Sequence, residues 1–274
     1  TLNEIRKFAG DNLEFGEINP AWLEEYGEYQ KLQNKTINTL AIHYRNIRVL
    51  YNDAIRNHII KRDIYPFYDF QIKQEKTHKR SLNINDIRRI RDVELKKENE
   101  MRARDLFMLS FYMNGINFKD LLLARKENIY QGRYMFNRAK TGRPYSVKIF
   151  PETQEIIDRY PGEIYLLNFM ERKELVNIKK DRNIPLYKDI TDQTNRLLKD
   201  VAEEAKVPVP LSTYYARHSL ATIARNIGIS RDDIRSILGH GENTVTDIYI
   251  DLDLERIDDA MRMILELLNQ GDTF

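Results

Sequence analysis

The stretch LGHGENTVTDIY, residues 238–249, decides how the fold of this chain is interpreted. His240 stands between two glycines, and Tyr249 follows it nine residues later. The chain contains 16 tyrosines, so a single tyrosine is ordinarily a packing residue that follows a turn. The alternative is a nucleophile held beside a proton donor, a role that tyrosine plays in covalent catalysis. The rest of the sequence has to decide between the two interpretations.

Two upstream segments carry cationic side chains of the kind that bind phosphate. Residues 134–150, YMFNRAKTGRPYSVKIF, have β-prone runs on either side of a Lys-Thr-Gly turn at Lys140, which predicts a β-hairpin. Residues 213–224, TYYARHSLATIA, place Arg217 in a helical segment. Arginine binds phosphate through a planar fork of donors, and lysine supplies a point charge.

In this order and spacing, the three segments resemble the tyrosine recombinase (phage integrase) family, and most closely the integrases of Bacteroides-type mobile elements. The ARHS motif and the LGH motif with its tyrosine nine residues later are specific, whereas KTG alone is weak. The resemblance covers essentially the whole chain, because residues 1–70 look like the core-binding domain of that family. It implies a core-binding (SAM-like) helical domain followed by a catalytic domain, which together clamp duplex DNA.

The resemblance also implies a chemistry. A tyrosine phenol attacks a DNA phosphate, forms a 3′-phosphotyrosyl link and releases a 5′-hydroxyl, and a second 5′-hydroxyl later reverses the step. No metal, ATP or other cofactor is expected, because the phosphodiester energy is retained and the protein mainly positions and neutralises the phosphoryl group. The implied roles are nucleophile for Tyr249, second catalytic arginine for Arg217, phosphate hydrogen bonding for His240 and protonation of the leaving 5′-oxygen for Lys140.

Each assignment has a plainer alternative. Arg217 is alternatively a surface arginine of a helix, His240 a capping residue in a Leu-Gly-His turn, and Lys140 a solvated turn lysine. His218, beside Arg217, is expected to be buried and to hydrogen-bond in a structural role.

The sequence departs from the family pattern at two positions. The first catalytic arginine of the family lies in a Gly-x-Arg segment, but this chain reads GINFKDLL, which puts Asn117 at that position. Tyr214 replaces the histidine of the family's His-x-x-Arg box, and a phenol is a poor base near neutral pH. Asn117 and Tyr214 are therefore expected at most to assist by a hydrogen bond to the phosphate. Loss of a transition-state arginine costs several powers of ten in comparable phosphoryl-transfer sites.

Arg138 is a candidate replacement for the missing arginine. It lies two residues before Lys140, and side chains two apart on a strand point to the same face. The alternative is a hairpin arginine that contacts the DNA backbone or solvent. Arg125 and Arg143 are weaker candidates.

The spacing of apolar residues predicts two N-terminal helices, a shorter one at residues 19–33 with Pro20 near its start and a long amphipathic one at residues 36–57. Apolar periodicity then stops, so we expect a domain at residues 1–75, a linker at 76–82 and a catalytic domain at 83–274. In the catalytic domain we expect a helix capped by Asn83 or Asn85, an apolar helix ending at Gly115, a short helix in FKDLLLA, the hairpin, and helices with short connections after Pro151. The fold class is therefore mainly α with a small antiparallel β-hairpin.

Charge is unevenly distributed, although the net charge is only +2. Residues 1–30 carry two basic and seven acidic side chains, whereas residues 31–80 carry eleven basic and four acidic ones. Such a basic segment is either a solvated helical face or a surface that contacts phosphate. On the second interpretation, backbone contacts with duplex DNA are expected from Lys35, Arg45, Arg48, Lys79 and Arg80.

The C-terminal stretch LERIDDAMRMILELLNQ has one apolar stripe, formed by Leu254, Ile257, Met261, Ile264 and Leu268. It either packs on its own domain or docks on a neighbouring protomer, and the resemblance favours the second, with the IDLD connection after Tyr249 giving the reach. We therefore expect a homo-tetramer on DNA and a monomer without it, with host DNA-bending proteins as accessory factors.

Composition sets further bounds. The chain of 274 residues has 42% hydrophobic residues and no apolar run long enough to cross a bilayer, so no membrane partner is expected. The absence of cysteine excludes disulfides and thiolate chemistry, and it suits a cytoplasmic protein. Because the first residue is threonine, we expect a further N-terminal DNA-binding piece.

The sequence thus favours a site-specific DNA recombinase, the integrase of a mobile element. One alternative is a recombinase relative that binds DNA without cutting it. The substitutions at Asn117 and Tyr214 favour this alternative, whereas the retention of all four remaining catalytic residues disfavours it: Lys140, Arg217, His240 and Tyr249. Another is relaxation of DNA in the manner of a type IB topoisomerase.

Overall fold

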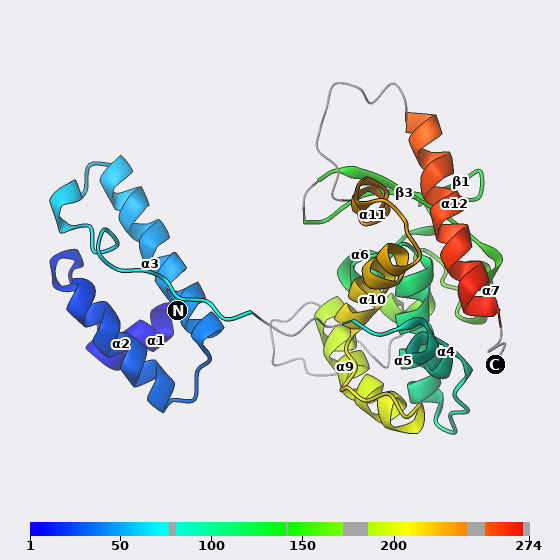
Figure 1. The fold of residues 1–274 in the computed structure, drawn as a ribbon, viewed down its shortest axis with the longest axis horizontal. Coiled ribbons are helices and arrows are strands. Elements are labelled where there is room, and N and C mark those ends of the chain that lie inside the picture. The colour runs from blue at the N-terminus through cyan, green and yellow to red at the C-terminus, as the bar shows by residue number, and fades with distance from the viewer. Residues whose placement is uncertain (77–80, 141, 172–185, 240–249, 271–274) are drawn as a thin grey trace. The chain divides into compact units, whose positions relative to one another are not determined.

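In the computed structural model, the described residues are those outside 77–80, 141, 172–185, 240–249 and 271–274. The chain divides into two compact units, Thr1–His78 and Lys79–Phe274 (Figure 1). The described part of the first unit is helical, and the second combines helices with a three-stranded antiparallel sheet in the order β1-β2-β3. The predicted fold class is confirmed. No described helix has the length and apolarity needed to cross a membrane.

The first unit contains α1 (Leu2–Ala9), α2 (Pro20–Leu32) and α3 (Ile37–Arg56), with 3-10 turns η1 (Phe15–Glu17) and η2 (Arg62–Ile64). Both predicted helices of this unit are confirmed. Their starts have local causes, because Asn19 accepts a hydrogen bond from the Trp22 N–H (3.0 Å) and Thr36 accepts one from the Thr39 N–H (3.2 Å). The short helix α1 was not predicted, since eight residues give little periodicity.

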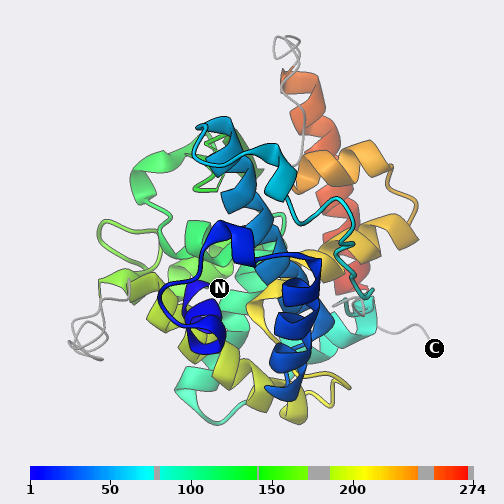
Figure 2. The same cartoon turned by 90° about the vertical axis from the view of Figure 1, so that its left-hand side faces the viewer.

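Aromatic side chains fill the core of the first unit. Tyr26, Tyr44 and Tyr51 are buried with Leu23 and Ile47 between the helices. The hydroxyl of Tyr44 donates to the Leu23 carbonyl (2.9 Å), which satisfies the polar end of a buried ring. Helix α3 lies beside α2 in this unit (Figure 2), and its buried residues face the core.

The second unit consists of the elements that follow, in chain order: α4 (Ile84–Asp92), α5 (Glu98–Tyr112), α6 (Phe118–Leu122), η3 (Lys126–Asn128), β1 (Ile129–Tyr130), β2 (Arg133–Asn137), β3 (Pro144–Lys148), α7 (Pro151–Arg159), η4 (Asn168–Met170), α9 (Leu186–Glu204), α10 (Thr213–Asn226), α11 (Arg231–Ile237) and α12 (Ile250–Asn269). Asn83 is the cap of α4, as predicted, with its side chain 2.9 Å from the Asp86 N–H.

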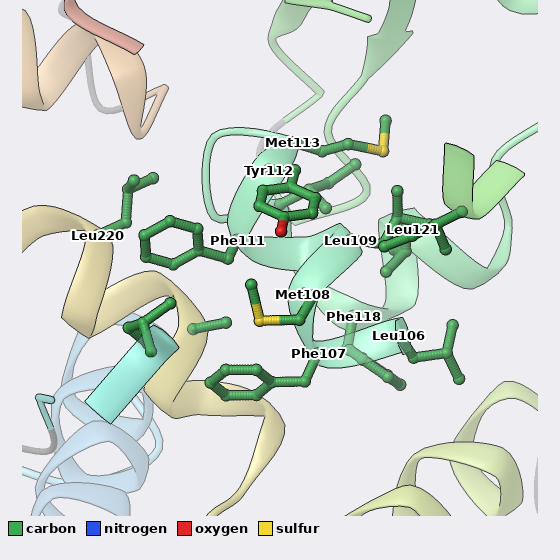
Figure 3. Close-up of a cluster of buried hydrophobic side chains, with 14 of the residues drawn as sticks. Leu106, Phe107, Met108, Leu109, Phe111, Tyr112, Met113, Phe118, Leu121 and Leu220 are labelled. Carbon is green, nitrogen blue, oxygen red and sulfur yellow. The ribbon is translucent and has the colours of Figure 1, made fainter. Parts of the chain in front are cut away.

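Helix α5 forms the centre of the second unit. Phe107, Met108, Leu109 and Phe111 are all buried, and the helix contacts α4, α7, α9 and α10 (Figure 3). The second half of the helix is apolar on nearly every side, and such a segment is stable only when it is surrounded in this way. The predicted stop at Gly115 is confirmed to within three residues, since the helix ends at Tyr112.

The predicted hairpin is formed by β2 and β3. Tyr134 lies opposite Val147 and both are buried, while Phe136 lies opposite Tyr145 with ring centroids 5.6 Å apart. The two-residue strand β1, which pairs with the other edge of β2, was not predicted.

The expectation of helices with short connections after Pro151 is wrong between α7 and residue 171. This segment is irregular apart from η4 and two isolated bridges, Arg125 with Tyr165 and Pro161 with Leu167. The Glu171 carboxylate accepts three backbone N–H groups, from residues 163, 164 and 165, at 2.6–2.7 Å. One side chain thus organises a loop that has no periodic signature.

In the structure, which describes one chain, the C-terminal stripe packs on its own unit, and docking in trans on DNA stays a prediction. Ile257, Met261, Ile264 and Leu268 are buried in the core of their own unit, and Leu254 is partly buried. The IDLD stretch, which was predicted to be a short connection, is the first turn of α12.

Polar contacts hold α12 at two levels. Asp258 accepts two hydrogen bonds from Arg133 of β2, at 2.5 and 3.1 Å. At the C-terminal end, Arg88 and Arg91 of α4 donate to the Leu268 carbonyl at 3.2 and 2.9 Å. Arginines that bind the last carbonyls of a helix satisfy acceptors that have no partner within the helix.

Candidate active site

Arg217 lies at the edge of the second unit's core. On α10 the neighbouring side chains Ala216 and Leu220 are buried, which leaves Arg217 half-buried. Its guanidinium donates from Nη1 to the Gly115 carbonyl (2.7 Å) and from Nη2 to the Leu238 carbonyl. It therefore links the end of α5 to the end of α11.

Gly115 is required at this contact. Its φ of +63° lies in the left-handed region, and a Cβ there would lie 3.0 Å from the Cα of Arg217. The sequence analysis used this glycine only as a helix stop, whereas it also allows α5 and α10 to approach.

Arg138 meets Arg217 at the same peptide. Its Nη1 donates to the carbonyls of Leu238 (3.1 Å) and Gly239 (2.6 Å), so both guanidinium groups bind the Leu238 oxygen. Gly239 has φ +64°, and a Cβ there would come within 3.1 Å of Nη1 of Arg138. The two glycine positions thus bring two arginines together at the residues that precede His240.

Tyr145 supports this cluster and was missed by the sequence analysis. Its hydroxyl donates to the Ile237 carbonyl, and the Arg138 guanidinium lies 5.9 Å from its ring centroid. Burial raises the pKa of Tyr145 to about 12, so the phenol remains a donor at neutral pH. Nothing in the sequence distinguishes this tyrosine, since it occupies an ordinary inward position of a hairpin.

The positive charges of Arg138 and Arg217 lie close enough to repel each other, which favours binding of an anion. Burial lowers the pKa of Arg217, and the nearby charge of Arg138 lowers that pKa further, while Tyr145, Tyr214 and Asp120 raise it. A phosphate between the two guanidinium groups would offset both the burial and the repulsion. Nε and Nη2 of Arg138 make no hydrogen bond to the described residues, so these donors are available.

The argument that placed Arg138 and Lys140 on one strand face is wrong. Strand β2 ends at Asn137, so both residues lie in the turn of the hairpin, where Arg138 is half-buried and Lys140 is exposed. The turn is closed by hydrogen bonds from Gly142 N to the Arg138 carbonyl (2.8 Å) and from Arg138 N to the Arg143 carbonyl (2.9 Å). The conformation of this turn, and not the alternation of side chains along a strand, places Arg138 beside Arg217.

Asp120 anchors the turn and was also missed. Its buried carboxylate accepts a hydrogen bond from the N–H of Ala139 at 3.0 Å, immediately before Lys140. No sequence signal marks it, because an acidic residue in the first turn of a helix is common. Asp120 is a positioning residue for the turn that carries Lys140.

An Asp120→Ala variant tests this role. Loss of a hydrogen bond to a charged acceptor frees the turn, so the covalent attachment to a nicked duplex that the resemblance implies is expected to slow about tenfold to a hundredfold. Duplex affinity is expected to change much less, because Asp120 itself is buried. Asp120→Asn keeps an acceptor oxygen and is the matched control. Equal losses of rate and affinity in both variants would contradict a positioning role.

The residues that depart from the family pattern are both at the surface. Asn117 is exposed, and its side chain caps α6 by accepting from the Lys119 N–H at 3.0 Å. Tyr214 is 53% exposed, with its ring 4.6 Å from that of His218. His218 is itself exposed, so its predicted burial is wrong, because it shares the solvent face of α10 with Tyr214.

Several predicted site residues lie elsewhere or cannot be placed. Arg125 forms an ion pair with Glu127 (2.8 Å) beside η3. In the first unit, Lys35 and Arg48 are exposed and Arg45 is partly exposed. His240, Tyr249, Lys79 and Arg80 lie outside the described residues. His240 follows Gly239 directly in the chain, and Tyr249 directly precedes α12.

Comparison with known proteins agrees with this description. Residues 1–72 match the phage integrase SAM-like domain. The chain is similar to a lambda integrase dimer bound to a COC′ core site, with 14% identity, a TM-score of 0.59, and coverage of 94% of this chain and 86% of that one. It is also similar to a lambda integrase tetramer bound to a Holliday junction, with 13% identity, a TM-score of 0.62, and coverage of 89% and 70%.

A further similar structure is that of the Tn1549 transposon integrase in complex with transposon right end DNA, with 13% identity, a TM-score of 0.61, and coverage of 98% and 92%. No curated protein sequence matched the chain. The chain thus combines a match to the phage integrase SAM-like domain at residues 1–72 with the overall fold of the tyrosine recombinase integrases.

Proposed function

We propose that this chain is a site-specific DNA recombinase, the integrase of a mobile element, and that it cuts and rejoins DNA through a covalent phosphotyrosyl intermediate. One observation carries the proposal: Arg138 and Arg217 converge on the peptide that precedes His240. Two cations that converge on one peptide suit a phosphodiester. The similar solved structures are complexes with DNA, which supports DNA as the partner.

The chemistry assigns one role to each group. The Tyr249 phenol gives up its proton to water as its oxygen attacks the phosphorus and forms the new P–O bond, and the bond to the 5′-oxygen breaks. Arg217 and Arg138 bind the non-bridging oxygens, His240 hydrogen-bonds one of them, and Lys140 delivers a proton to the leaving 5′-oxygen. A 5′-hydroxyl of a second strand reverses the step, and a tetramer on DNA brings the strands together.

A second candidate function is DNA binding without cleavage. It is favoured by Asn117, whose neutral side chain is engaged as a helix cap and adds no charge to the site. Such a protein would assemble on the same DNA sites and leave the phosphodiester intact.

Covalent trapping separates these functions. The protein is incubated with nicked suicide duplexes tiled across the ends of its host element, and adducts are resolved on a denaturing gel. We expect an adduct with the unaltered chain and none with Tyr249→Phe, which keeps the ring and removes only the nucleophilic oxygen. Binding of these duplexes without any adduct would favour the non-cutting relative.

A further inference from the structure

Lys119 carries a positive charge that the proposed chemistry does not use. It is the second residue of the short helix α6, and its side chain is half-buried. Its Nζ lies 5.1 Å from the centroid of the Tyr187 ring, which belongs to the first turn of α9. A cation over the face of an aromatic ring is attracted to it electrostatically. Lys119 and Tyr187, called the cation–ring pair below, therefore hold a flexible lysine side chain at one place between α6 and α9.

The charge of Lys119 is not neutralised by the described part of the chain, where its Nζ forms no hydrogen bond or ion pair. The carboxylate of Asp120, the next residue, accepts the N–H of Ala139 instead. Asp189, two residues after Tyr187, does not pair with it either. A half-buried ammonium usually pairs with an anion, because desolvation otherwise penalises its charge. The three donors of this ammonium therefore suit an anion that comes from outside the described residues.

Both helices of the cation–ring pair are tied to the candidate active site. On the side of α6, Asp120 holds the hairpin turn that carries Lys140. On the side of α9, Asn195 accepts a hydrogen bond of 2.9 Å from the N–H of Thr213, the first residue of the helix that carries Arg217. The pair therefore borders the site from the two elements that support its hairpin turn and its second arginine.

The chemistry of the pair fits a phosphate other than the one that is cut. Arg138 and Arg217 meet at the Leu238 carbonyl, whereas the Lys119 charge is held against α9. Lysine binds phosphate as a point charge, and a phenol can donate a second hydrogen bond to the same group. The Tyr187 hydroxyl has no hydrogen-bond partner among the described residues, so it is available for this. Phosphates follow one another along each DNA strand, so a neighbour is present wherever one is bound.

We propose that Lys119 and Tyr187 together bind the phosphate next to the cleaved one on the cut strand, and so hold that strand in place for attack. The inference rests on the proposed function and adds a substrate-binding pair that lies outside the sequence motifs. It also returns a positive charge to the neighbourhood of Asn117, which stands two residues before Lys119 and is neutral. Holding the strand at a second phosphate favours the reaction by fixing the orientation of the first.

Neutral phosphates test the proposal directly. The full chain is given nicked suicide duplexes in which one phosphate at a time around the cut is a methylphosphonate, which removes the negative charge and keeps the backbone. The readout is the single-turnover rate of covalent attachment at saturating protein. With the unaltered chain, we expect the rate to fall about tenfold at one phosphate next to the cut. Lys119→Ala should show a similar loss on the ordinary duplex and no further loss when this phosphate is neutral.

Three further variants refine the test. Lys119→Arg keeps the charge and should keep most of the sensitivity to the neutral phosphate. Tyr187→Leu keeps an apolar side chain but removes the ring and its hydroxyl, so it should reduce the sensitivity at the same phosphate. Lys199→Ala is the matched control, because it removes an exposed lysine of α9 that lies about 18 Å along the helix from Tyr187. This control should keep both the normal rate and the full sensitivity.

The outcomes distinguish the inference from the function on which it rests. If Lys119→Ala slows attachment on every duplex by the same factor, and the sensitive phosphate stays sensitive, Lys119 only supports the fold. The inference is then overturned, although the chain still cuts DNA. The same holds if the unaltered chain tolerates a neutral charge at every phosphate next to the cut. Absence of an adduct between the unaltered chain and any ordinary duplex would overturn the proposed function, and the inference with it.

Discussion

Replacing Arg217 with alanine is expected to slow formation of the covalent adduct by roughly a thousandfold or more, which is the scale on which arginines act in phosphoryl transfer. The reason is geometric as well as electrostatic, because Arg217 is half-buried and its two Nη groups fix the ends of α5 and α11. The measurement is the single-turnover rate on a nicked duplex at saturating protein.

Two further variants sharpen this test. Arg217→Lys keeps the charge and loses the fork, so it should recover only a small part of the rate. Arg225→Ala removes an exposed arginine from the same helix and should cut at the normal rate. Cleavage by Arg217→Ala within about tenfold of normal would exclude Arg217 from transition-state binding.

The second large effect concerns Asn117, which stands where the family that the chain resembles has an arginine. If Arg138 replaces that arginine, Arg138→Ala should lower the cleavage rate about a hundredfold to a thousandfold. Asn117→Arg should raise the rate of the unaltered chain, although loss of the α6 cap costs about 1 kcal/mol of stability. Combining the two changes should restore most of the rate lost in Arg138→Ala.

The combination distinguishes compensation from simple support of the fold. If both side chains serve the same phosphate, the double-mutant cycle is non-additive: Arg138→Ala lowers the cleavage rate much less once residue 117 is arginine. If Arg138→Ala cuts normally and only binds DNA less well, the compensation hypothesis is wrong and Arg138 is a backbone contact.

What could be predicted from the sequence followed local rules. The starts of α2, α3 and α4 were marked by Asn19, Thr36 and Asn83, whose side chains bond to N–H groups only three residues away. The hairpin was predictable because its two strands are adjacent in the chain. The fold class followed from these elements together with the resemblance.

What could not be predicted depends on contacts between distant residues. Tyr145 contacts Ile237 across 92 residues, and Asp120 holds a turn 19 residues away. Arg138 was singled out for the wrong reason, since strand alternation does not extend past Asn137. Whether the apolar stripe of α12 packs in cis or in trans is not encoded in its periodicity, because both partners would bury the same face.

The contacts between α4 and α12 have a consequence for the synthesis of the protein. Arg88, in the first helix of the second unit, binds the Leu268 carbonyl across 180 residues. A ribosome therefore has to release almost the whole of this unit before its first and last helices can join, and such a long loop makes closure a late step in folding. Until α12 packs, the core residues that it covers stay open to solvent.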